Sequence, residues 1–175
     1  MFELPRCIGT LHSGGVQRYH AVPSVLDKQR VDSHAWSVAM IVLCLTEGTA
    51  SRDLLLHALL HDAAEIVTGD IPYTVKRSHV ELKSIVDAIA DSAHEQLLYP
   101  LPPLMKHETA LLKMADTLDG WRWCQLHEAI GPVSNRWAGA YANACAKFAG
   151  VLSEDVLDRA ALLYKAFDTR PTTTA

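Results

Sequence analysis

The sequence predicts an all-α fold, a single helical bundle of about six helices. Apolar residues recur with helical spacing through most of the chain, and capping residues and glycines bound these segments. No stretch of any length alternates apolar and polar residues with the period of two that a strand requires. A chain of 175 residues suits one domain with a sizeable core, and no repeat or linker-like segment divides it. We therefore expect one domain over residues 1–175.

The expected helices share an apolar periodicity and mostly end near glycine or proline. They cover residues 33–47, 52–68, 79–98, 105–130, 135–152 and 154–167. Asp32 or Ser33 supplies the N-cap of the first, Ser51 that of the second and Ser153 that of the last. The two C-terminal helices, within residues 134–168, are expected to serve packing or oligomerisation.

Two of these helices carry a more specific expectation. The leucines of the helix over 52–68 cover more than one of its faces, which predicts a central, surrounded helix. In the helix over 79–98, apolar residues four apart predict one buried stripe, formed by Ile85, Ile89, Ala93 and Leu97. Between the two helices, Pro72 predicts a loop over 71–74.

Composition excludes several classes of function. The formal net charge of −4 argues against a nucleic acid polymer as an electrostatic partner. No apolar run approaches the ~18 residues of a membrane span, and the first residues do not read as a secretory signal. The four cysteines show no close pairing or C-x2-C spacing, so we interpret them as reduced thiols, three of them (Cys44, Cys124 and Cys145) buried in helices. These features favour a cytoplasmic protein.

Polar residues cluster within the apolar segment HALLHDAAEIVTGD. His61 and Asp62 are adjacent, Glu65 follows on the same side of the helix, and Asp70 comes directly after Gly69. Burying a carboxylate is costly unless it is paired or binds a metal. A lone His-Asp pair often only satisfies a core histidine. Four such groups within ten residues favour a shared chemical role instead.

Two other helices offer matching groups. His34 opens the first apolar helix, and Asp116 interrupts the apolar run ALLKMADTL. Together with His61 and Asp62 they would give two nitrogens and two oxygens to one divalent ion, with positions left for water and substrate. Ligand type alone does not choose among Mn, Fe, Co, Zn and Ni.

The order His, His-Asp, Asp resembles that of the HD superfamily of metal-dependent phosphohydrolases. More narrowly, the chain is similar to the small 5′-deoxynucleotidases, the YfbR-like proteins. The matching segments are RYHAVPSVLDKQRVDSHAWSVAM, ALLHDAAEIVTGDIPYTVK and LLKMADTLDG. Phage-encoded relatives that resemble the RYH…VP variant include dATP triphosphohydrolases. The resemblance therefore implies a single HD domain with its metal site within 18–120, acting in a bacterial cytoplasm or in a phage host's.

The resemblance also implies roles for individual residues. His34, His61, Asp62 and Asp116 would bind one divalent transition metal (Co, Zn or Mn). Glu65 would handle protons or orient the attacking water, and Asp70 would contact the sugar hydroxyl or act as a second acid–base group. The substrate contacts would come from Arg18 on the phosphate, Lys76 at the mouth and Tyr19, which replaces a tryptophan common in the family. His20 is a further pocket candidate beside them, and Trp36 is ambiguous between core packing and base stacking.

The predicted function is hydrolysis at the 5′ phosphate of 2′-deoxynucleotides, dNMP or dNTP, with dATP as the leading candidate. The products would be a deoxynucleoside and phosphate or polyphosphate. One alternative is a nucleotide-binding regulatory or assembly protein with little turnover, and another is an oxidative di-iron member of the superfamily. A homo-oligomer, dimer or higher, is predicted from the Ala-rich late helices and from Trp121, Trp123 and Trp137, which belong either to the core or to a subunit interface.

Overall fold

Helix α7 (Lys106–His127) is the element against which α2, α3, α8 and α9 pack. The computed structural model describes residues 3–19, 27–96, 98–127 and 133–168. Within these ranges there are nine helices and one isolated β-bridge but no strand, so the predicted all-α fold is confirmed. The other helices are α1 Leu4–Ser13, α2 Val31–Leu45, α3 Arg52–Leu60, α4 Glu65–Thr68, α5 Tyr73–Ser78, α6 Val80–Gln96, α8 Val133–Phe148 and α9 Glu154–Phe167.

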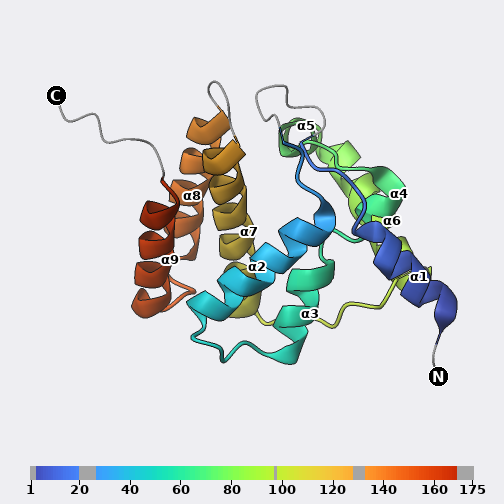
Figure 1. Ribbon diagram of the computed structural model, residues 1–175, viewed down its shortest axis with the longest axis horizontal. Helices are drawn as coiled ribbons and strands as arrows, with labels where there is room; N and C mark the ends of the chain where they lie inside the picture. Colours follow the sequence, from blue (N-terminus) through green and yellow to red (C-terminus); the bar gives the residue numbers. More distant parts are fainter. Residues whose placement is uncertain (1–2, 20–26, 97, 128–132, 169–175) are drawn as a thin grey trace.

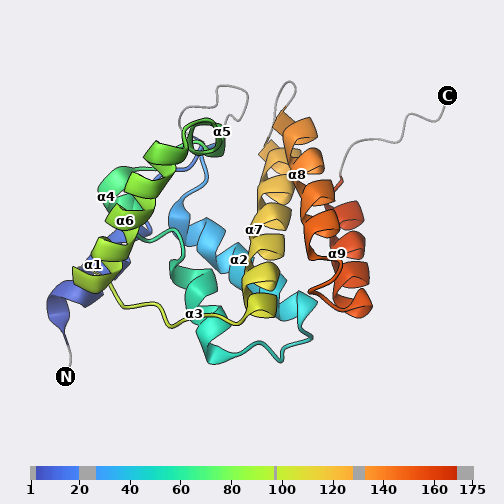
Figure 2. The same ribbon diagram turned by 180° about the vertical axis from the view of Figure 1, so that it is seen from behind.

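The helices form two groups with α2 and α3 between them. On one side, α8 and α9 pack against α7, and on the other α1, α4 and α5 gather around α6 (Figures 1 and 2). Helix α2 crosses α7 and also contacts α3 (Figure 1). The larger apolar core joins α2, α3, α7, α8 and α9, whereas a smaller one joins the end of α3 and the turn after it to α6. The candidate site residues lie where the two groups meet.

The larger core forms because α2 is apolar over much of its surface and α7 buries its apolar residues against the neighbouring helices. Val38, Val42 and Leu45 of α2 are fully buried, as is Trp121 of α7. The indole ring of Trp121 stacks on the ring of Tyr164, and its Nε1 donates a hydrogen bond to the Tyr164 carbonyl oxygen at 3.1 Å. Trp121 therefore belongs to the core of this chain, where its polar N–H is also satisfied.

The helix expected over 52–68 is divided, which corrects the prediction of one continuous element. Helix α3 ends at Leu60, and a turn follows in which Glu65 N–H donates to the Asp62 carbonyl at 3.0 Å. Helix α4 then begins at Glu65. The expectation of a surrounded helix was also wrong, because Leu59 is 48% exposed. The break places His61 and Asp62 in a turn rather than on a helix face.

The described residues form nine helices where about six were expected, because α1, α4 and α5 were not predicted as separate helices. Helix α5 begins at Tyr73, directly after Pro72, where a loop was predicted. Proline in that position leaves the following residues free to be helical, since its fixed φ suits a helix N-terminus. The predicted buried stripe of α6 is wrong for Ile85 and Ile89, which are exposed, and right for Ala93. Leu97 lies outside the described residues.

The four cysteines all lie in the described part of the chain. All four cysteines are free, with Cys124 buried, Cys7 and Cys145 half-buried, and Cys44 exposed, contrary to the buried position expected for it. None of the helices in the described ranges combines the length and apolarity that crossing a membrane requires.

Candidate metal centre

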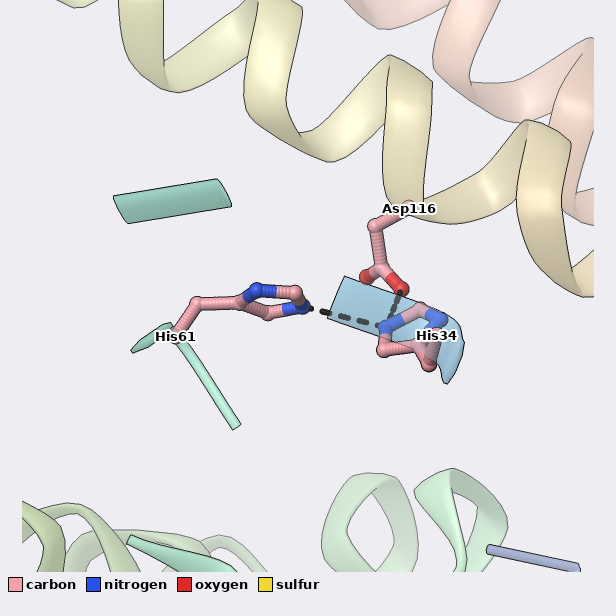
Figure 3. A group of neighbouring side chains, drawn as sticks. All are labelled: His34, His61 and Asp116. Atoms are coloured by element: carbon pink, nitrogen blue, oxygen red, sulfur yellow. Dashed lines mark hydrogen bonds and ion pairs between the residues drawn. The ribbon is translucent and has the colours of Figure 1, made fainter. Parts of the chain in front are cut away.

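Three segments distant in sequence bring His34, His61 and Asp116 together (Figure 3). His34 lies in the first turn of α2, His61 directly after α3, and Asp116 in the middle of α7. His34 Nε2 lies 3.2 Å from His61 Nε2 and 3.4 Å from Asp116 Oδ1. One atom from each residue can therefore face a common point.

The second nitrogen of each imidazole fixes which atom points into this cluster. His34 Nδ1 donates to Asp119 Oδ2 at 2.7 Å, and His61 Nδ1 donates to the Ala58 carbonyl oxygen at 3.2 Å. With Nδ1 used as a donor on both rings, Nε2 of each is the nitrogen that remains for a ligand. This arrangement is typical of metal-binding histidines, whose other N–H is held by a carboxylate or a backbone carbonyl.

Asp62 lies beside these three residues, but outside the group whose ligand atoms all lie within 4.8 Å of one another. Its Oδ2 lies 3.3 Å from His34 Nε2, and its Oδ1 lies 3.6 Å from His61 Nε2. In a tetrahedral site with bonds of about 2.0–2.1 Å, neighbouring ligand atoms are about 3.3–3.4 Å apart. The three distances from His34 Nε2, of 3.2, 3.3 and 3.4 Å, fit that spacing. Asp62 Oδ2 also faces Arg18 Nε at 3.6 Å.

The pKa values of the two histidines are shifted in opposite directions. Burial and the nearby Arg18 oppose a charge on His34, but hydrogen bonds to three carboxylates outweigh them and raise its pKa to about 10. Burial lowers the pKa of His61, which is therefore neutral at pH 7. Burial also raises the pKa of the carboxyl groups of Asp62 and Asp116, yet the surrounding imidazoles and cations hold each pKa below its usual range. At neutral pH the cluster thus holds two ionised carboxylates, one protonated imidazole and one neutral imidazole.

Arg18 lies beside this cluster. The Gln17–Arg30 bridge, together with an Arg18 N–H bond to the Gln29 carbonyl of 2.7 Å, holds its backbone against the start of α2. The guanidinium is within 3.6 Å of Asp62 and 3.9 Å of Asp116. Burial opposes its charge, but Asp62 and other acidic groups raise its pKa above the ordinary value. It is a permanent cation at the metal cluster, suited to a phosphate group.

Two further carboxylates lie around the cluster. Burial, together with Asp62 and Asp70, raises the pKa of Glu65 to about 8, and its buried Oε2 has no hydrogen-bond partner among the described residues. Asp70 follows Gly69, whose positive φ of 67° turns the chain back. Asp70 Oδ2 accepts the backbone N–H of Tyr19 at 2.8 Å. Tyr19 itself has a φ of 60°, a conformation rare for a residue with a Cβ atom and often found at functional sites.

The other residues predicted to contact the substrate do not all lie near the cluster. Tyr19 is buried against Cys124, and the Arg18 guanidinium lies 5.5 Å from its ring centre. Lys76 on α5 is close enough to lower the pKa of Glu65. Trp36 is 62% exposed and lies two residues after His34, about 200° around the helix, so the structure does not bring it to the cluster and it does not pack in the core. His20 lies outside the described residues.

Two buried polar residues of the site had no assignment from the sequence, Asp119 and Gln29. Asp119 had a usable signal, because it is a second carboxylate about one turn after Asp116 on α7. Gln29 had none, since its neighbours in the sequence form an ordinary polar segment.

An all-α fold with a His/His-Asp/Asp cluster at its centre defines the HD-domain class of proteins. The fold is similar to that of the cyanophage S-2L HD phosphohydrolase DatZ, a structure bound to dA and one catalytic Zn²⁺ ion. The TM-score is 0.76 at 20% sequence identity, over 95% of this chain and 96% of that one. Within this class, the family model for YfbR-like 5′-deoxynucleotidases matches residues 15–156, so the chain belongs to the YfbR-like 5′-deoxynucleotidase family.

Curated relatives agree with this family. The chain is 26% identical over 118 residues to 5′-deoxynucleotidases of Yersinia pestis (strain Pestoides F) and Yersinia pseudotuberculosis (serotype O:3, strain YPIII). Each match includes 55% of this chain and spans 60% of the relative's length.

Proposed function

We propose that the chain is a metal-dependent phosphohydrolase that acts at the 5′ phosphate of 2′-deoxynucleotides. The observation that carries this proposal is the convergence of His34 Nε2, His61 Nε2 and a carboxylate oxygen of Asp116, with Arg18 beside them. Membership of a 5′-deoxynucleotidase family supports the substrate class. The dA bound to DatZ supports adenine as the base and dATP as the leading candidate, with dNMP and other dNTP substrates included.

The donor set suits one divalent transition metal such as Zn, Co or Mn, held by His34, His61, Asp62 and Asp116. When bound, such an ion lowers the pKa of water and withdraws charge from a phosphate oxygen. Two nitrogens and two carboxylates leave positions open for water and substrate. The zinc ion in DatZ supports the same type of ion here.

Arg18 and Glu65 supply the groups that a phosphate ester needs besides the metal. The Arg18 guanidinium can hold two oxygens of the phosphate in parallel and neutralise the charge that accumulates on them. Glu65, whose buried Oε2 has no hydrogen-bond partner among the described residues, is proposed to carry the proton that passes to the leaving 5′ oxygen. Asp70, held by the Tyr19 N–H, is proposed to contact the sugar hydroxyl or to act as a second acid–base group.

The test is a hydrolysis assay on the dNMP, dNDP and dNTP forms of the four bases with Zn, Co or Mn and identification of the products. We expect release of phosphate or polyphosphate, abolished by Asp62→Ala and retained by Asp158→Ala, a matched change at an exposed position on α9. No release from any deoxynucleotide with any of these metals would refute the proposal. Tight nucleotide retention without hydrolysis would favour a regulatory protein instead.

We also propose a homo-oligomer, dimer or higher. Exposed apolar side chains gather on the neighbouring helices α1, α4 and α6, and exposed patches of this kind mark interaction sites. They are Leu4, Ile8, Leu11, Ile66, Val67, Ile85 and Ile89. Sedimentation at micromolar concentration should show association that Leu11→Glu weakens and Leu162→Glu, on the exposed face of α9, does not. Sedimentation as a monomer alone would refute it.

The proposed site of action is the cytoplasm, of a bacterium or of a phage host. Free thiols and a nucleotide substrate both support that compartment.

A further inference from the structure

Asp119 is a fully buried carboxylate on α7 that lies behind the candidate metal ligands. Its Oδ2 accepts hydrogen bonds from His34 Nδ1 and from Gln29 Nε2, both at 2.7 Å. Its Oδ1 accepts two more from Arg122, at 3.0 Å from Nε and 2.8 Å from Nη2. Both oxygens are therefore fully used by N–H donors, and no part of this carboxylate remains for a metal or a substrate.

A buried charge held in this way needs a reason, because a well-packed apolar residue often stabilises a core as well or better. The reason lies in what Asp119 fixes. It requires His34 Nδ1 to carry a proton, so that Nε2 points toward His61 and Asp116. Arg122, which also binds the Ser37 hydroxyl at 2.8 Å, supplies the compensating charge.

Gln29 extends the same chain of hydrogen bonds in the other direction. Its side chain is fully buried, and its Oε1 accepts a hydrogen bond of 3.2 Å from Arg18 Nη1. The amide can have only this orientation, since a guanidinium only donates and the Asp119 carboxylate only accepts. A continuous buried path therefore runs from Arg18 through Gln29 and Asp119 to His34.

We propose that Asp119 and Gln29 form a positioning unit that orients His34 for the metal and Arg18 for the phosphate. The inference rests on the proposed function, because it assigns a metal to His34 and a phosphate to Arg18. Neither residue touches the reacting atoms. Each acts through the one it holds, and the hydrogen bond between them couples the two orientations.

The first test measures metal binding rather than turnover. Zinc affinity is determined by competition with a chromophoric chelator, and the visible absorption of the cobalt-loaded protein reports ligand geometry. Asp119→Asn should weaken zinc binding by about 10- to 100-fold and alter the cobalt spectrum. Val42→Ala, which removes buried methyl groups two turns along α2 from His34, should destabilise the fold but leave both readouts unchanged.

The positioning role of Asp119 and the metal centre itself give different results when either is wrong. If the wild-type chain binds zinc and Asp119→Asn binds it within twofold with the same cobalt spectrum, the positioning role of Asp119 is wrong and the proposed function stands. If the wild-type chain binds neither zinc nor cobalt, the metal centre itself is wrong and the positioning role with it.

Gln29→Leu tests the Arg18 end of this hydrogen-bonded path, and it remains informative if Asp119→Asn does not fold. The change keeps the size of the side chain and removes the hydrogen bonds to Arg18 and Asp119. We expect KM for the deoxynucleotide to rise about tenfold, the value of one hydrogen bond to a charged group, with kcat changed less. A KM within twofold of the wild-type value would refute the link between Gln29 and Arg18.

Discussion

Metal binding at the candidate centre should expel one proton, and that proton should come from His34. In the metal-free chain, hydrogen bonds to carboxylates hold the pKa of His34 at about 10 against the opposing effects of burial and Arg18. A metal needs the Nε2 lone pair, so the proton on that atom must leave. His61 contributes none, because burial lowers its pKa, and Asp62 is already ionised.

The number of protons released and the pH dependence of zinc affinity follow from assigning this proton to His34. At pH 6.5, a group with a pKa of about 10 is almost completely protonated, so zinc binding should release about one proton per ion. The apparent affinity should then rise about tenfold for each pH unit between about 6.5 and 8, because deprotonating His34 becomes easier as the pH rises. Above pH 10 the dependence should end, since His34 is then neutral before the metal binds.

The assay is zinc titration calorimetry at pH 6.5 in several weakly chelating buffers of different ionisation enthalpy. The dependence of the observed heat on that enthalpy gives the number of protons released. Glu65→Gln is the appropriate background, because the carboxyl of Glu65, with a pKa of about 8, would otherwise release its own proton beside the metal. A release near zero, with a zinc affinity independent of pH, would refute the assignment of His34 as a protonated ligand. A release near two would show a second source of protons at the site, either His61 or metal-bound water.

Three further predictions test other features. In the metal-free chain, the pKa of Glu65 is raised from 4.5 to about 8, so its contribution to stability is present below pH 4.5 and is lost as the pH rises to about 8. Urea denaturation with chelator present measures this loss. Between pH 4.5 and about 8, the unfolding free energy of Glu65→Gln should fall by about 2–3 kcal/mol less than that of the wild-type chain. Parallel pH curves for the two proteins would contradict this prediction. A Cβ atom at Gly120 would overlap the ring of Trp137, whereas one at Gly139 meets nothing within 4 Å. Gly120→Ala should therefore cost about 1–3 kcal/mol of unfolding free energy and Gly139→Ala should gain about 0.5–1 kcal/mol, and equal effects would refute the contact. Arg18→Lys should lower kcat/KM at least tenfold, because lysine cannot hold two phosphate oxygens in a fixed geometry, and an unchanged value would exclude Arg18 from phosphate binding.

The helical fold was predictable because its signals are local. Ser51 caps α3 through a local contact, in which its Oγ accepts the Leu54 N–H at 3.0 Å. This contact fixes where α3 begins and depends on no distant residue. The end of α3 was not predictable, because residues 61–64 include two alanines and carry no breaker. Their turn is favoured by tertiary contacts: Ala63 and Ala64 are buried in the smaller core beside α6.

The residues of the candidate site also divide into those that the sequence made recognisable and those that it did not. Carboxylates at Asp62 and Asp116 could be recognised because each interrupts an apolar pattern, which signals a cost that something must offset. Of the two residues proposed to orient the site, Gln29 has no such pattern. Gln29 and Asp119 are 90 positions apart, and only the packing of the segment before α2 against α7 makes them partners. Trp36 shows the converse, since sharing a helix with His34 did not bring it to the same face.

The central claim is that one divalent ion is held by His34, His61, Asp62 and Asp116. Anomalous diffraction from zinc-loaded crystals, recorded above and below the zinc absorption edge, tests it most directly. We predict one peak per chain, about 2.0–2.2 Å from the Nε2 atoms of both histidines and from an oxygen of each aspartate. A peak bound by other residues, or none at this cluster in a zinc-saturated protein, would contradict the account.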